Sequence, residues 1–244
     1  MVIHFIKIYG IALACILICN ITSYGQNVDK RAQFFPKIEL KVQSIPKKDN
    51  LWVFILAGQS NMSGRGLVEP QDTIPSERMI EHLPDSISIL LVPTAVGGSK
   101  ISEWLNDSIH RNISLLTNFK QKVELGKKYG QVKGILWHQG ESDAHPVNIP
   151  LYRKRLRDLF KKFREIVGNE DLPVLIGELG SYSKSKGSWL KINKQMNSYV
   201  RTDRRSLIIK TSDLKDRGDR VHFNAEGQRI IGQRFAKEYI KKFM

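Results

Sequence analysis

Cysteine is almost absent from this chain of 244 residues, and its two cysteines, Cys15 and Cys19, both lie near the N-terminus. The remaining sequence therefore excludes disulfides, a cysteine nucleophile and thiolate metal sites. Long hydrophobic runs are also scarce. The apolar stretch 8–19 is shorter than the roughly 20 residues that a membrane-spanning helix needs.

The first 25 residues predict a secretory signal peptide. Lys7 gives the segment a weakly basic start, the apolar stretch follows, and Ser23 and Gly25 supply the small residues of a cleavage site. We expect cleavage near Gly25 and a secreted or periplasmic protein, with no stable membrane insertion after the signal is removed. Two alternatives stay open: an uncleaved N-terminal anchor, and lipidation at Cys15, which the apolar residues directly after it disfavour.

Acidic residues are few beside basic ones, with 24 Asp and Glu against 39 Lys and Arg and a net charge of +15. Such a charge is compatible with an anionic partner such as an acidic polysaccharide, an envelope surface or nucleic acid. The basic residues are spread over many expected helix faces, and no basic strand is interleaved with aromatic residues. We therefore expect a solvated basic surface and no nucleic-acid partner, while the oligomeric state is left open.

The length and the 41% hydrophobic content fit one α/β domain with a sizeable core. Residues 26–50 show little periodicity and predict a linker or N-terminal arm, followed by a domain over 51–244. Apolar runs alternate with amphipathic patterns, which predicts a three-layer α/β/α sandwich around a five-stranded parallel sheet. The expected strands are 51–57, 87–92, 134–137, 173–177 and 207–210, and the expected helices are 112–129, 152–167, 188–200 and 225–243.

The stretch Leu51–Gly66, LWVFILAGQSNMSGRG, carries the first candidate site. An uncharged strand ends at a glycine, and Gln59, Ser60 and Asn61 then follow at the position where open α/β sheets bind ligands. Ser60 is the candidate nucleophile, which requires a base and oxyanion donors elsewhere in the chain. The alternative for this turn is a serine or asparagine that caps the next helix.

Three further blocks follow this turn in the sequence. The four blocks are Gly58–Met62 (GQSNM), Ala95–Ser99 (AVGGS) with Trp104, Trp137–Asp143 (WHQGESD) and Asp219–Phe223 (DRVHF). In this order they resemble the SGNH hydrolases, in the variant shared by sialate O-acetylesterase-like proteins and the acetylxylan esterases of carbohydrate esterase family 6. The resemblance spans residues 51–244 and implies a flavodoxin-like SGNH hydrolase fold with strand order 2-1-3-4-5.

His222 is the candidate base, because imidazole titrates near neutrality and can accept the serine proton and return it to a leaving alcohol. Asp219, three residues earlier, is the candidate acid that orients the imidazole. The pair matches the Asp-x-x-His of the SGNH pattern near the C-terminus. Glu141 and, by spacing, Asp216 are rivals for the acid, and helix capping is the alternative for the pair.

Three donors are expected to hold the oxyanion: the backbone N–H groups of Ser60 and Gly98 and the side-chain amide of Gln139. Glycine suits the role because no side chain blocks a close approach. Many relatives have asparagine at the third position, where glutamine stands here. The expected supporting or substrate-binding residues are Gln59, Asn61, Arg65 and Glu141, and Trp104 is either sugar-lining or structural.

These features predict an exported serine esterase that hydrolyses O-acetyl esters on carbohydrates through an acyl-enzyme intermediate, with no cofactor. No metal site is expected, because His138 and His145 lack a third ligand. The resemblance leaves sialic acid, xylan and related glycans open as the acetylated substrate. The alternatives are a lipase or thioesterase on the same scaffold, a non-catalytic glycan-binding protein, and a glycoside hydrolase that uses Glu141 and Asp143, whose spacing suits that reaction poorly.

Overall fold

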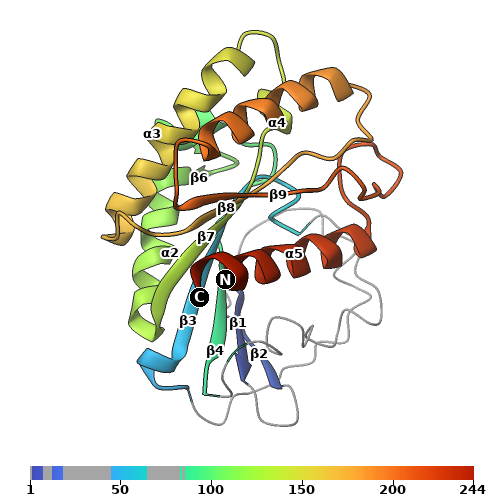
Figure 1. Ribbon diagram of the computed structural model, residues 1–244. Coiled ribbons are helices and arrows are strands. Elements are labelled where there is room, and N and C mark those ends of the chain that lie inside the picture. The colour runs from blue at the N-terminus through green and yellow to red at the C-terminus, as the bar shows by residue number, and fades with distance from the viewer. Residues whose placement is uncertain (1, 8–12, 19–44, 65–82, 84–85) are drawn as a thin grey trace.

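A computed structural model describes residues 2–7, 13–18, 45–64, 83 and 86–244. One sheet forms its centre, with strand order β2-β1-β4-β3-β7-β8-β9 (Figure 1). The five strands from β4 to β9 are mutually parallel, which confirms the expected sheet and its 2-1-3-4-5 order. These strands are β3 (Leu51–Gly58), β4 (Ser88–Pro93), β7 (Gln131–His138), β8 (Val174–Gly177) and β9 (Ser206–Ile209).

Two N-terminal strands extend the sheet beyond β4. β1 (Val2–Lys7) pairs antiparallel with β2 (Leu13–Ile18) and with β4. Both belong to the expected signal peptide, for which the sequence predicted no strand. Its removal, which stays a prediction, would leave β4 at the edge of a purely parallel sheet. Residues 26–44 of the expected arm lie outside the described residues, and its end contains the 3₁₀ turn η2 (Lys48–Asn50).

Helices cover both faces of the sheet, as the sandwich requires (Figure 1). One face packs against α1 (Ile101–Leu105), α2 (Leu115–Tyr129), α3 (Ile149–Val167) and α4 (Lys186–Val200), and the other against α5 (Ala225–Phe243). Alternate residues of β3 serve the two cores: Val53 and Ile55 belong to the first and Phe54 to the second. Among the described helices, none is both long and apolar enough to cross a membrane.

The expected helix over 112–129 begins later than predicted, at Leu115. A small hairpin precedes it, formed by β5 (Ile109–His110) and β6 (Ile113–Ser114). The two residues of its turn, Arg111 and Asn112, have φ angles of 51° and 64°. Left-handed backbone cannot continue a right-handed helix, so the helix starts after the hairpin.

The C-terminal helix has the bounds that the sequence predicted, Ala225–Phe243. Its start is defined by Asn224, whose side-chain oxygen accepts a hydrogen bond of 2.7 Å from the Gly227 N–H. This cap satisfies one of the backbone donors that a helix leaves unpaired at its N-terminus. It also fixes the chain directly after His222.

Candidate active site

The Ser60 turn depends on Gly58, the last residue of β3. Gly58 has a φ of 132°, and a Cβ atom there would lie 2.0 Å from the His138 carbonyl oxygen of β7. Only glycine permits this approach, and the Gln59 N–H then donates to the same oxygen at 2.9 Å. The turn therefore holds Ser60 at the carboxyl edge of the sheet, where the residue is 7% exposed.

Ser60, His222 and Asp219 form one continuous chain of hydrogen bonds. His222 Nε2 lies 2.9 Å from Ser60 Oγ, and His222 Nδ1 lies 2.7 Å from Asp219 Oδ2. The two partners of the imidazole thus bind opposite ring nitrogens, as a base between a hydroxyl and an orienting carboxylate requires. The structure brings together these three residues, which are separated by up to 162 positions in the sequence.

The Asp219 carboxylate is held by groups of its own loop. Oδ1 accepts the backbone N–H groups of His222 at 2.8 Å and Val221 at 2.9 Å, and Oδ2 also accepts Arg217 Nε at 2.6 Å. Partial burial alone would raise the pKa of Asp219, but the hydrogen bonds from His222, Arg217 and Val221 outweigh it. The pKa of Asp219 therefore lies well below its usual range, so the carboxylate is ionised at neutral pH.

The rival acids do not contact His222. Glu141 Oε1 accepts a 2.8 Å hydrogen bond from Asn61 Nδ2 and lies 3.8 Å from His138 Nδ1. Asp216 Oδ2 instead accepts the backbone N–H groups of residues 218 and 220. The geometry therefore favours Asp219 as the partner of the imidazole.

Asn61 joins the Ser60 turn to the loop that carries His222. Its Nδ2 donates to the Val221 carbonyl at 3.1 Å as well as to Glu141, and its Oδ1 accepts the Phe223 N–H at 3.0 Å. Both neighbours of His222 in the sequence are thus tied to the residue after Ser60. Asn61 therefore positions the histidine rather than lining its cavity.

A polar cavity of about 500 Å³ opens beside Ser60. Its lining includes Ser60 and His222 with Gly98, whose φ is 85°. Among the described residues, no acceptor receives a hydrogen bond from the backbone N–H of Ser60 or of Gly98. These two donors therefore remain available to a bound ligand, and their role as oxyanion donors stays a prediction.

The expectation for Gln139 is wrong, because its amide is already engaged. Gln139 is fully buried, and Nε2 donates to the Ser99 carbonyl at 3.1 Å and to Asp143 Oδ2 at 2.7 Å. The amide oxygen accepts Tyr152 Oη at 2.9 Å. Both ends of the amide are therefore used inside the protein, and no proton is left for an oxyanion.

Asp143 and Trp104 are likewise buried and form hydrogen bonds inside the protein. Asp143 is fully buried, and its Oδ2 accepts the Ile101 N–H at 2.8 Å, so it cannot flank a sugar with Glu141 as a glycoside hydrolase would need. Burial raises the pKa of Asp143, although its hydrogen bonds and Arg155 oppose the shift. Trp104 is also fully buried, and its Nε1 donates to Ser99 Oγ at 2.9 Å.

Gln59 supports the site through hydrogen bonds of its side chain to the backbone of a neighbouring loop. Its Oε1 lies 3.4 Å from the backbone N atoms of Gly140 and Ser142, at the start of the 3₁₀ turn η5 (Glu141–Asp143). It therefore links the Ser60 turn to the third sequence block. The remaining expected residue, Arg65, lies outside the described residues.

Several cavity residues were not predicted from the sequence. They come from four separate segments, and they are Arg111, Ser142, Ser183, Ser185, Trp189 and Val221. Ser142 lies within the third block and Val221 within the fourth, so both had a sequence signal. The Ser142 Oγ donates to the Gly98 carbonyl at 2.9 Å. The other four depend on tertiary packing and have no motif.

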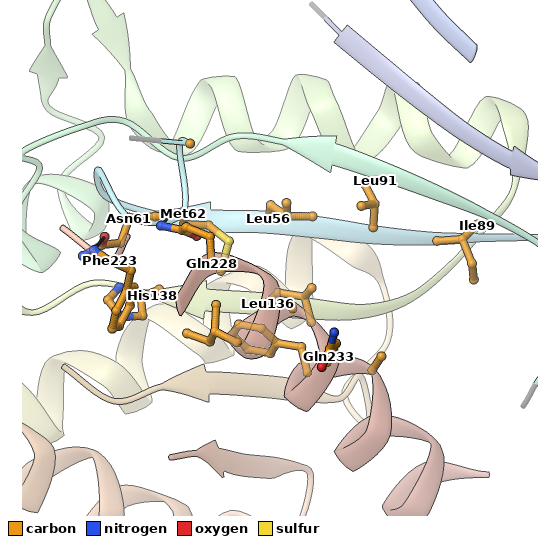
Figure 2. Close-up of a pocket in the computed structure, with 15 residues that line it drawn as sticks. Leu56, Asn61, Met62, Ile89, Leu91, Leu136, His138, Phe223, Gln228 and Gln233 are labelled. Carbon is orange, nitrogen blue, oxygen red and sulfur yellow. Dashed lines mark hydrogen bonds between the residues drawn. The ribbon is translucent and has the colours of Figure 1, made fainter. Parts of the chain in front are cut away.

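A second cavity, of about 260 Å³, lies between the sheet and α5 (Figure 2). Figure 2 shows Leu56, Ile89 and Leu136 of the strands along its wall, with Asn61 and Phe223 at one end. Its lining is mainly apolar and contains neither Ser60 nor His222. No group of three or more His, Cys, Asp or Glu side chains suited to a metal ion occurs in the described part of the chain.

The strand order is the one that the sequence resemblance to the SGNH hydrolases implies. Residues 76–241 match the family described as carbohydrate esterase, sialic acid-specific acetylesterase, and the chain belongs to this family. The match includes Asp219 and His222 and begins after Ser60. Membership supports carbohydrate esterase activity.

Individual relatives agree with this assignment. A probable carbohydrate esterase of Arabidopsis thaliana is 25% identical over 249 residues, which cover 78% of this chain and 91% of the relative. An X-ray structure of an Arabidopsis thaliana protein has a TM-score of 0.68 at 22% identity and covers 80% of this chain and all of that one. A carbohydrate acetylesterase from Xanthomonas citri has a TM-score of 0.59 at 18% identity over 78% of this chain and 56% of its own. The two structures support the fold.

Proposed function

We propose that this chain is an exported serine esterase that removes O-acetyl groups from carbohydrates through an acyl-enzyme intermediate. The observation that carries the proposal is the hydrogen-bond chain from Ser60 through His222 to Asp219, beside two unpaired backbone donors. The family of the chain and the acetylesterase named among its structural neighbours support the acetylated sugar. Sialic acid, xylan and other glycans are the candidate carriers of the acetyl group.

In the first half of the reaction, Ser60 Oγ attacks the acetyl carbonyl carbon while His222 Nε2 accepts its proton. The developing oxyanion is held by the N–H groups of Ser60 and Gly98, each of which contributes a few kcal/mol when preorganised. The Asp219 carboxylate stabilises the imidazolium. His222 then returns the proton to the sugar oxygen, and the C–O bond to the sugar breaks.

In the second half, water hydrolyses the acetyl-enzyme. His222, neutral again, takes a proton from the water, and the hydroxide attacks the same carbonyl carbon. The proton returns to Ser60 Oγ as acetate leaves. The same donors serve both halves, because each passes through a tetrahedral oxyanion at the same place.

The test is acetate release from 4-nitrophenyl acetate and from acetylated glycans by the wild type, Ser60→Ala and Ser63→Ala. We expect Ser60→Ala to lose about 10⁴-fold or more of kcat/KM, since the nucleophile is removed. Ser63 lies in the same turn, and among the described residues its Oγ bonds only the Ser60 carbonyl, so Ser63→Ala is the matched control and stays near wild type.

Two outcomes would redirect the proposal. Glycan binding without acetate release from any ester would indicate the non-catalytic binding protein. Faster hydrolysis of 4-nitrophenyl octanoate than of the acetate would indicate a lipase or thioesterase. Full activity in Ser60→Ala would refute the nucleophile.

Export is tested separately, by determining the N-terminus of the chain recovered from the periplasm or medium. A mature chain that starts at Gln26 agrees with the signal peptide, and one that starts at Met1 contradicts it.

A further inference from the structure

The third sequence block places two buried side chains beside the loop that carries His222, and the proposed reaction uses neither. His138 ends β7 and is 1% exposed, and the side chain of Glu141, in the turn η5, is 6% exposed. Each has a buried atom without a hydrogen-bond partner among the described residues, Nδ1 of His138 and Oε2 of Glu141. Such atoms cost free energy, so two of them on neighbouring side chains call for an explanation.

Glu141 determines which way the side-chain amide of Asn61 points. A carboxylate only accepts hydrogen bonds, so Oε1, at 2.8 Å from Asn61 Nδ2, requires the amino end of the amide. The amide oxygen then faces the other way, where it accepts the Phe223 N–H at 3.0 Å. A reversed amide would lose this bond and the one to the Val221 carbonyl. Glu141 thus helps to fix both neighbours of His222 in the sequence.

His138 supports the same loop through the ring of Phe223. The two rings form a T-shaped pair, with 5.4 Å between centroids and 76° between planes. His138 Nε2 lies 3.0 Å from the Glu178 carbonyl oxygen, which only accepts, so Nε2 carries a proton and donates it. Gly177 of β8 makes room for this ring, because a Cβ atom there would lie 2.6 Å from His138 Cδ2. The ring is therefore held in one orientation against the residue that follows His222.

We propose that Glu141 and His138 are positioning residues that hold His222 from two sides, Glu141 through Asn61 and His138 through Phe223. This inference rests on the proposed esterase function and adds to it a role for the third block. Glu141 also lines the polar cavity, so contact with the sugar is the alternative role. Its oxygens disfavour that role, because Oε1 is bonded to Asn61 and Oε2 is buried.

The first test compares Glu141→Leu, which has a similar size but no acceptor, with Glu141→Gln. The substrates are 4-nitrophenyl acetate and the O-acetylated glycan that the wild type cleaves best. We expect Glu141→Leu to lower kcat about tenfold on both, with KM unchanged, because His222 is displaced from Ser60. Glu141→Gln should stay within about threefold of the wild-type kcat, since its amide oxygen accepts from Asn61 and its amino group faces His138 Nδ1.

Glu178→Leu is the matched control for the loss of a buried carboxylate. The Glu178 side chain is 8% exposed and also follows a strand of the sheet, but its Oε1 bonds Asn197 and Lys210 at 2.6 and 2.7 Å. It has no contact with Asn61 in the described part of the chain, so we expect kcat near wild type. Urea unfolding verifies that each variant is folded under the assay conditions.

A double-mutant cycle tests whether Glu141 acts through Asn61. If it does, Asn61→Ala combined with Glu141→Leu loses no more kcat than Asn61→Ala alone, whereas independent contributions multiply. His138→Leu removes the ring that contacts Phe223, and we expect it to lower kcat about fivefold. Because this effect does not pass through Asn61, it should multiply with that of Asn61→Ala.

A second readout does not depend on catalysis. The proton that His222 Nδ1 shares with Asp219 Oδ2 over 2.7 Å gives a downfield proton NMR signal that is sensitive to the geometry of this hydrogen bond. We expect Glu141→Leu and His138→Leu to shift or broaden the signal. Glu141→Gln and Glu178→Leu should leave it in place.

The outcomes separate this inference from the proposed function. A wild-type kcat with an unshifted signal in Glu141→Leu overturns the inference. A KM for the glycan that rises in both Glu141 variants at unchanged kcat also overturns it and indicates contact with the sugar. A wild type that releases acetate from no ester overturns the proposed esterase instead, while the NMR signal still shows whether Glu141 and His138 hold His222.

Discussion

The turn over residues 59–64 contributes to two cavities that differ in their lining. The cavity of about 500 Å³ presents hydroxyls, unpaired backbone donors and Arg111. The cavity of about 260 Å³ in Figure 2 presents mainly leucine, isoleucine and phenylalanine side chains from the strands and α5. Adjacent residues are divided between them: Ser60 and His222 line the polar cavity, whereas Asn61 and Phe223 line the apolar one.

The comparison shows that the more apolar of the two cavities is not the one that holds the candidate catalytic residues. Reaction at a carbonyl needs a nucleophile, a base and donors that converge on one point, and only the polar cavity of the two has them. The apolar cavity is continuous with the second hydrophobic core, so its contribution is to stability. Substitutions on the polar side should therefore change kcat, and those on the apolar side the free energy of unfolding.

The largest effect in this comparison is expected for Asp219→Asn, on the polar side. The amide keeps the shape but cannot stabilise the imidazolium or fix its tautomer, so we expect kcat to fall about 10³-fold. The measurement is acetate release under saturating substrate. Asp216→Asn is the matched control from the same loop, and we expect less than about a tenfold loss, since Asp216 bonds backbone N–H groups and not His222. The reverse ranking would make Asp216 the orienting acid.

Asn61→Ala changes a residue that lies between the two cavities, and we expect its effect on kcat to be smaller than that of Asp219→Asn. It removes the bonds to Val221 and Phe223 that hold His222 between them, so we expect kcat to fall about 10- to 100-fold. The unpaired groups left behind should also lower the free energy of unfolding by about 1–3 kcal/mol. Both are measured, by kinetics and by urea unfolding. Gln228→Ala is the control, because Gln228 lines the apolar cavity and its side chain bonds only the Asn61 carbonyl among the described residues. A kcat loss equal to that of Asn61→Ala would remove the positioning role.

Much of the polar side could be predicted from the sequence, because it follows from strand ends. The apolar run over 51–57 specifies a strand buried on both faces, and parallel strands place the residues that follow them at one edge. The Asp-x-x-His spacing then brings Asp219 to the imidazole within a single turn. The C-terminal helix was equally predictable, since its cap and its apolar stripe agree.

The remaining details could not be predicted, because residue types do not show which groups will form a given hydrogen bond or where the backbone becomes left-handed. Gln139 has the amide that an oxyanion needs, but Asp143 and Tyr152 bind it from within the protein. The helix that was expected from Asn112 is delayed by two left-handed residues, and neither is a glycine that would mark them. Arg111 reaches the cavity only through that hairpin, so its place in the site could not be read from a motif.

On the apolar side, Ile231→Ala should affect stability far more than activity. Ile231 is 6% exposed, belongs to the second core and lines the cavity of Figure 2. Removing its side chain enlarges that cavity, and we expect the free energy of unfolding to fall by about 2–3 kcal/mol. Under conditions where the variant stays folded, kcat/KM should remain within about twofold of wild type. Ile231→Val should lose about 1 kcal/mol, and a large loss of kcat in either folded variant would mean that the two cavities are coupled.

The smallest effect is the pH dependence of stability contributed by Asp219. Its pKa in the folded protein lies well below the ordinary value of about 3.9 that an unfolded aspartate has. A carboxyl group with a lowered folded pKa stabilises the protein above the unfolded value and loses that contribution as the pH falls through the folded value. The part of the difference in free energy of unfolding between wild type and Asp219→Asn that depends on the ionised carboxylate should therefore shrink as the pH falls below about 4. Urea unfolding at several pH values measures it, and a difference that grows as the pH falls below about 4 would show that the hydrogen bonds to Asp219 do not favour its ionised form.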